Sequence, residues 1–144
     1  MGPDSKIVED LRAAGLRPTR QRLALARLLF GHGNQHVTAE TLFERAQLAG
    51  IKVSLATVYN TLHQFTDGGL LRRVMVGSLR SYFDTNVTDH HHFFFEDTGE
   101  IADIPPDKFN WQINQTINGI SPSGLPVGTA LSRIDVVVRL RAAD

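Results

Sequence analysis

Three adjacent histidines, His90, His91 and His92, are the residues of this chain best suited to chemistry. They follow Asp89 and precede three phenylalanines at positions 93–95. Alternate side chains of an extended strand point to opposite faces, so we expect His90 and His92 to share one face and His91 to join Asp89 on the other. Imidazole is the commonest protein metal ligand and titrates near neutral pH. The triplet is therefore the predicted sensing site.

The composition limits the class of protein. The chain has 144 residues, of which 42% are hydrophobic and 21% charged, which suits one medium domain or two small ones and does not indicate disorder. No apolar run approaches the ~20 residues of a membrane span, and the first residues lack an apolar signal core, so we expect a cytoplasmic protein with no membrane partner. The absence of cysteine excludes disulfides, thiolate zinc sites and thiol catalysis.

The charge is unevenly distributed along the chain. Residues 1–84 hold 11 Lys and Arg against 7 Asp and Glu, a net charge of +4, and residues 85–144 hold 4 against 8, a net charge of −4. This asymmetry favours a polyanion-binding half joined to a different one. Because +4 is modest, an ordinary solvated surface is the alternative interpretation.

Apolar spacing and capping residues predict four helices in the first half of the chain. The expected segments are residues 6–14, a helix opening at Pro18-Thr19, one from Thr38 to Gly50, and one from Ser54 to about Phe65. In the fourth helix we expect a buried stripe of Leu55, Val58, Leu62 and Phe65 and a polar face of Ser54, Thr57, Asn60, Thr61 and Gln64.

Strands are expected to follow. Residues 70–76 and 80–84 predict a hairpin that carries Arg72, Arg73 and Arg80. The polar stretch 86–89 is the best linker candidate. Beyond it the patterns predict strands over 91–95 and 100–104, a helix opening at Pro105-Pro106 with an apolar stripe of Phe109, Ile113, Ile117 and Ile120, and a final strand over 130–140.

Helices followed by a basic hairpin form the pattern of a winged helix-turn-helix domain, whose fourth helix would enter the major groove of DNA. Asn60 and Gln64 can each pair bidentately with adenine, and Thr57 or Tyr59 could contact a thymine methyl. We expect phosphate contacts from Arg17, Arg20, Arg22, Arg72 and Arg73. A helical module that binds protein instead of DNA would show a similar polar face.

Four stretches, AGLRPTRQR (14–22), HVTAETLFERA (36–46), SLATVYNTLHQFTDGGLLRR (54–73) and DHHHFFFEDTGEI (89–101), resemble the ferric uptake regulator family over roughly residues 7–141. The resemblance implies a homodimeric, metal-responsive transcription factor that binds double-stranded, AT-rich palindromic operator DNA. It implies an α+β fold with a winged-helix DNA-binding domain (1–85), a hinge (86–89) and an α/β dimerisation and ligand-sensing domain (90–144). It also places Tyr59 and Asn60 in the recognition helix and matches Arg17 to a position that reaches the minor groove.

The resemblance further implies a regulatory metal site with ligands from both domains, at His36, Asp84, His90, His92 and Asp103. Imidazoles and carboxylates without a soft ligand suit Fe(II), Mn(II) or Zn(II). A second site of the family, here Asp89 and His91, lacks its partners, because the matching positions are approximately Asn110 and Ala130. The family's structural zinc site, built from four cysteines, is missing, since Phe95-Glu96-Asp97-Thr98 replaces its CxxC; packing of the nearby phenylalanines and Trp111 is the expected substitute.

A histidine triplet without cysteine resembles the iron response regulator branch of the family. That resemblance implies haem as a cofactor, with its ligand among His90, His91 and His92, and control of iron and haem genes. The first alternative is an ordinary repressor of the same family that senses Fe, Mn or Zn. More remote alternatives are a metal-dependent enzyme, and a haem or metal carrier that does not bind DNA. The chain has no Gly-rich phosphate loop, HExxH helix or serine elbow, so we expect that it is not an enzyme.

Overall fold

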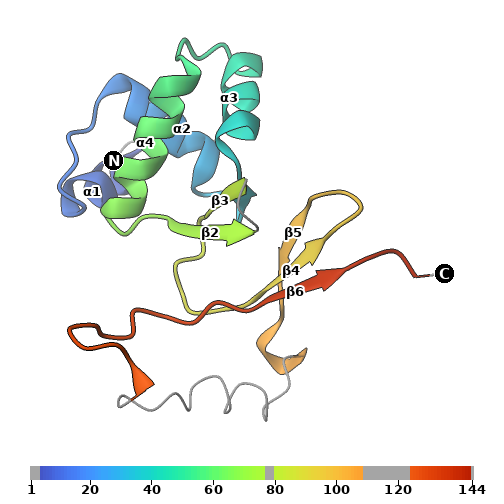
Figure 1. Ribbon diagram of the computed structural model, residues 1–144. Coiled ribbons are helices and arrows are strands. Elements are labelled where there is room, and N and C mark those ends of the chain that lie inside the picture. The colour runs from blue at the N-terminus through green and yellow to red at the C-terminus, as the bar shows by residue number, and fades with distance from the viewer. Residues whose placement is uncertain (1–3, 77–79, 109–123, 144) are drawn as a thin grey trace. The chain divides into compact units, whose positions relative to one another are not determined.

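The structure, a computed structural model, describes residues 4–76, 80–108 and 124–143 of the chain (Figure 1). The chain divides into two compact units, Met1–Thr88 and Asp89–Asp144, which are called the N-unit and the C-unit below. The division falls within the predicted linker 86–89. The role of that stretch as a hinge stays a prediction.

The described part of the N-unit contains four helices, bundled beside a small sheet (Figure 1). Their bounds are α1 Ser5–Ala13, α2 Arg20–Leu29, α3 Ala39–Leu48 and α4 Leu55–Asp67. Hydroxyl side chains cap three of the helices as the sequence predicts: Thr19 caps α2, Thr38 caps α3 and Ser54 caps α4, and each accepts a hydrogen bond from a backbone N–H in the first turn.

The cap of α3 is a capping box that uses an unusual residue. Thr41 stands where a capping box ordinarily has Glu or Gln. The Thr38 hydroxyl accepts the Thr41 N–H at 3.1 Å, and the Thr41 hydroxyl accepts the Thr38 N–H at 3.0 Å. Two of the four N–H groups that a helix start leaves unsatisfied therefore find partners.

The N-unit core is built on one face of α4. Val58, Leu62 and Phe65 are fully buried there, against Leu25, Ala26 and Leu29 of α2, among others. Two expectations for α4 were wrong. Leu55 is 36% exposed, and Thr61, expected on the polar face, is only 5% exposed. The reason is helical geometry: position 61 is three residues after Val58 and four before Phe65, which places it on the buried face.

The sheet of the N-unit has the order β1-β3-β2, with antiparallel neighbours. The hairpin strands β2 (Arg72–Val76) and β3 (Arg80–Asp84) confirm the predicted wing. The two-residue strand β1 (His36–Val37) was not predicted, and it pairs His36 opposite Asp84. This short strand is what positions His36.

The described part of the C-unit is a three-stranded sheet of order β5-β4-β6. Strands β4 (His92–Phe95) and β5 (Ile101–Asp103) are antiparallel, and β4 and β6 (Val137–Leu140) are parallel. The final strand is shorter than the expected 130–140, because pairing with the four-residue β4 supports four residues only. A 3-10 turn, η1, covers Pro106–Lys108. The helix expected beyond it, with the stripe of Phe109, Ile113, Ile117 and Ile120, lies outside the described residues.

Among the described residues, no helix combines the length and the apolar character that a bilayer crossing requires.

Replacing Leu62 by Ala removes a fully buried side chain from the core of the N-unit. We expect the free energy of unfolding of this unit to fall by about 2–5 kcal/mol, the usual cost of such a truncation. Urea unfolding followed by circular dichroism measures it. Leu48→Ala is the matched control, because Leu48 is 89% exposed, and its effect should stay within about 0.5 kcal/mol. Equal effects of the two variants would contradict this description of the core.

Candidate functional site

Two imidazoles of the C-unit converge on one carboxylate oxygen. The β4–β5 register pairs His92 with Asp103. The Nε2 atom of His90 lies 3.0 Å and that of His92 3.4 Å from Oδ1 of Asp103. The two rings lie side by side, with centroids 4.4 Å apart. The predicted sharing of one face by His90 and His92 therefore holds in the structure.

This cluster has the dimensions of a small-ion site. Donor atoms bonded at about 2.1 Å to a common ion lie about 3.0 Å apart at octahedral angles and about 3.4 Å apart at tetrahedral angles. The two nitrogen–oxygen separations, 3.0 and 3.4 Å, lie within the range that these two geometries span. The side chains of His90, His92 and Asp103 are 7%, 1% and 31% exposed, so the cluster is largely removed from water. The donors present therefore fit a divalent cation.

A second donor pair lies in the N-unit. Asp84, at the end of β3, is fully buried, and its Oδ2 lies 3.0 Å from Nε2 of His36. Its Oδ1 accepts the N–H of Asn86 at 2.8 Å. A buried carboxylate is costly unless it is paired, and here the backbone and an imidazole supply partners. The pair offers one nitrogen and one oxygen to a metal ion.

The five predicted metal ligands thus form two sets, one within each unit. The C-unit set supplies three donors and the N-unit set two. His91 belongs to neither set: its Nδ1 accepts the N–H of Val136 at 3.2 Å, on the other side of the chain from its neighbours. Of the missing partners of the second site, Ala130 is exposed and has no ligand atom, and Asn110 lies outside the described residues.

The predicted DNA-reading side chains lie on and beside α4. Ser54 and Thr57 are engaged in the helix cap, where the Ser54 hydroxyl donates to that of Thr57 at 3.0 Å. Tyr59 is 37% exposed, and its hydroxyl donates to Oε1 of Glu40 at 2.6 Å. This hydrogen bond, followed by desolvation and by the charge of Glu40, raises the pKa of the Tyr59 phenol. Asn60 is exposed.

Arginines from α2 and its approach continue this surface. Arg17 and Arg20 are exposed, as phosphate contacts must be. Arg22 donates from Nε and Nη2 to Oε1 of Gln64, at 3.3 and 3.1 Å, and from Nη1 to the carbonyl of Arg17, at 2.9 Å. No local pattern indicates the link between Arg22 and Gln64, because the two residues are 42 positions apart.

The wing departs from expectation at one arginine. Arg72 is only 8% exposed, and its Nη1 donates to the carbonyl of Thr88 at 3.0 Å. A guanidinium buried in this way does not lie on the surface, so the expected phosphate contact of Arg72 is withdrawn. Arg73 is half-buried, with Nε and Nη2 donating to the Ser81 hydroxyl at 3.0 and 2.8 Å. Its phosphate contact stays a prediction.

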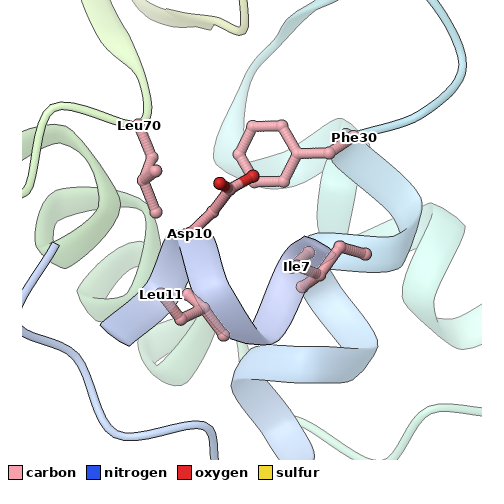
Figure 2. A pocket seen from close by; sticks show the side chains of 6 residues that line it. Ile7, Asp10, Leu11, Phe30 and Leu70 are labelled. Atoms are coloured by element: carbon pink, nitrogen blue, oxygen red, sulfur yellow. The ribbon is translucent and has the colours of Figure 1, made fainter. Parts of the chain in front are cut away.

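A small cleft in the N-unit offers no catalytic chemistry. Figure 2 shows the apolar side chains of Ile7, Leu11, Phe30 and Leu70 around the carboxylate of Asp10. That carboxylate, the one titratable group in the lining, pairs with Lys6 at 3.5 Å on the surface. A lone carboxylate without a second acid, base or nucleophile does not form an active site.

A model of the ferric uptake regulator family matches residues 13–122. The chain belongs to the ferric uptake regulator family. Members of this family are transcriptional regulators that bind DNA as dimers and respond to metals, and they are not enzymes. The match covers both units and so includes the recognition helix and the histidine triplet.

Individual relatives agree with the family assignment. The chain is 34% identical over 103 residues to a peroxide-responsive repressor of Staphylococcus aureus, covering 72% of this chain and 69% of the relative. The ferric uptake regulator of Vibrio cholerae is similar in structure, with a TM-score of 0.77, 26% identity and coverage of 94% of this chain and 99% of that one. The ferric uptake regulator of Pseudomonas aeruginosa, solved with manganese, has a TM-score of 0.70, 26% identity and coverage of 94% and 97%. These likenesses confirm the α+β fold with a winged helix.

The contact between Tyr59 and Glu40 can be tested by titration. Glu40→Gln replaces a carboxylate acceptor by a neutral one, so we expect the pKa of Tyr59 to fall toward its ordinary value. The absorbance of the phenolate measures it, and Tyr82, the other tyrosine, is common to both proteins. Glu44→Gln, on the exposed side of the same helix, is the control and should leave the titration unchanged. An identical curve for Glu40→Gln would show that the hydrogen bond does not form in solution.

Proposed function

We propose that this protein is a repressor that binds operator DNA as a homodimer and responds to a divalent metal ion. The observation that carries the proposal is the convergence of His90 and His92 on Oδ1 of Asp103, in a chain whose N-unit is a winged helix. The family supports the DNA-binding, metal-responsive class. The proposed metal ligands, named below, are residues of this chain.

We propose that one ion takes ligands from both sets. The C-unit set has three donors and the N-unit set two, and neither alone fills the six positions common for Fe(II) or Mn(II). When bound, the ion supplies a positive charge that holds His36, Asp84, His90, His92 and Asp103 together. Because the two sets stand on different sides of residues 86–89, shared coordination fixes the arrangement of the units. A ligand acts as a switch only if it prefers one arrangement in this way.

The metal is Fe(II), Mn(II) or Zn(II). The donors are imidazole nitrogens and carboxylate oxygens, which suit these borderline and hard ions, and the chain has no cysteine to favour a softer one. The manganese in the solved Pseudomonas aeruginosa regulator is consistent with this choice. Because the chain has no cysteine, a structural zinc site made of four cysteines cannot form in it.

The DNA partner is a double-stranded, AT-rich palindrome. A homodimer presents two α4 helices, so its operator repeats a half-site with two-fold symmetry. Exposed Asn60 suits adenine, and the exposed guanidinium groups of Arg17 and Arg20 suit phosphate contacts. The positive net charge of residues 1–84 favours this partner.

A haem response, as in the iron response regulator branch, is the second candidate. The histidine triplet and the absence of cysteine favour it, because histidine is a standard axial haem ligand. The geometry favours the ion. The side chains of His90 and His92 are 7% and 1% exposed and face a carboxylate, whereas an axial ligand must present its nitrogen to an open, planar cofactor. His91 is the triplet member that faces away from this cluster.

The shared ion predicts that a ligand in the N-unit affects binding by the C-unit. We expect His36→Ala to weaken Mn(II) or Zn(II) binding by about tenfold or more, since even outer-shell partners of metal ligands contribute 10–100-fold. Isothermal titration calorimetry measures the affinity and the number of ions per chain. His32→Ala is the control, because His32 lies in an exposed loop with its Nε2 at the Arg27 carbonyl. A normal affinity in His36→Ala would show that the C-unit set binds alone.

The regulatory function predicts metal-dependent and sequence-specific DNA binding. At physiological salt, we expect a palindromic promoter duplex to bind about 10³-fold or more tightly than its scrambled counterpart. Loading the protein with Fe(II), Mn(II) or Zn(II) should change that affinity by about fivefold or more, a typical coupling between two sites. Gel-shift titrations with metal, haem or chelator measure both. Equal binding of the two duplexes excludes a specific regulator, and a response to haem alone selects the second candidate.

A further inference from the structure

The contact between Arg22 and Gln64 engages the amide oxygen of Gln64. Gln64 lies on the exposed face of α4, one turn after Asn60. Two nitrogens of the Arg22 guanidinium, Nε and Nη2, approach the same atom of Gln64, Oε1, at 3.3 and 3.1 Å. The third, Nη1, is held by the carbonyl of Arg17 at 2.9 Å, so the guanidinium is fixed at both ends.

The chemistry of the pair sets the orientation of the amide. Arginine has only donors, so the atom that faces it must be the oxygen of Gln64 and not the nitrogen. Two N–H groups of the guanidinium converge on this oxygen, so the acceptor of the amide is engaged by Arg22. The Nε2 group of Gln64 makes no hydrogen bond to any residue that the structure describes. Gln64 therefore offers two N–H donors to its surroundings and no acceptor.

We propose that Gln64 reads guanine, not adenine, at its position in the operator. A glutamine pairs with adenine by accepting from N6 and donating to N7, and the acceptor is already occupied by Arg22. Guanine presents two acceptors, O6 and N7, which match two donors. Arg22 is the positioning residue, because its contact with Oε1 leaves only the N–H donors of Gln64 for the base. Exposed Asn60, whose side chain makes no hydrogen bond within the described ranges, keeps both groups for adenine. The inference rests on the proposed binding of operator DNA by α4.

The test is a base scan. Each operator position is substituted in turn, and binding to the metal-loaded full-length protein is measured by gel shift. The position at which Gln64→Ala abolishes base preference is the Gln64 position. There we expect the wild type to prefer guanine over adenine by about tenfold, the discrimination of one bidentate contact. Substituting 7-deazaguanine, which lacks the N7 acceptor, should remove most of that preference.

Arg22→Met releases the oxygen of Gln64, so the preference at this position should shift from guanine toward adenine. Arg22→Lys retains a donor and should keep guanine. Arg20→Met is the matched control: it removes an equal charge from the same helix without touching Gln64, so it should weaken binding to every sequence and leave the preference unchanged. Circular dichroism checks that each variant folds.

The outcomes separate the two proposals. If the wild type binds its operator specifically but prefers adenine at the Gln64 position, or if Arg22→Met leaves the preference unchanged, the inference about Gln64 is wrong. If the wild type binds operator and scrambled duplex equally, the proposed function fails, and the role of Gln64 fails with it. A preference for guanine that only Arg22→Met reverses supports both.

Discussion

One carboxylate oxygen, Oδ1 of Asp103, receives two imidazole nitrogens, and the proposed metal response depends on this convergence. It requires the alternation of side chains that puts His90 and His92 on one face, and the register that pairs His92 with Asp103. A slip of one residue between β4 and β5 would turn His91 toward the carboxylate in their place. On its other edge β4 pairs with β6, so the strand that carries His92 is the central strand of this sheet.

The ligand pair of the N-unit, His36 and Asp84, is positioned in a different way. The pair also comes from neighbouring strands, with His36 opposite Asp84, but the carboxylate here is fully buried. Burial makes an unpaired charge expensive, so Asp84 is held by the N–H of Asn86 and the ring of His36. Each unit thus holds an incomplete ligand set, and the proposed metal response rests on one ion that completes both.

Features set by residues close in sequence were predictable, and contacts between residues far apart in sequence were not. The caps Thr19, Thr38 and Ser54 and the wing follow from residues close in sequence, and so does the common face of His90 and His92. Strand β1 is not predictable because two residues carry no periodicity. The burial of Thr61 does follow from its spacing to Val58 and Phe65, and it was missed because a hydroxyl side chain is typical of an exposed face. Of the five metal candidates, His90 and His92 also followed from the histidine triplet, whereas His36, Asp84 and Asp103 came from the family resemblance. The partners of Gln64 and Arg72 depend on tertiary packing, and no local pattern encodes them.

Glu96 and Asp97, in the segment where the family resemblance implies a CxxC, hold the end of β6 by hydrogen bonds. Asp97 Oδ2 accepts the N–H of Ala142 at 2.6 Å, and the N–H of Glu96 donates to the carbonyl of Leu140 at 2.8 Å. The guanidinium of Arg139 lies 5.3 Å from the centroid of the Phe94 ring, whereas its ion pair with Glu96, at 3.9 Å between half-exposed side chains, contributes little. The end of β6 is therefore held by two hydrogen bonds, one of them to the side chain of Asp97, and by one ring contact.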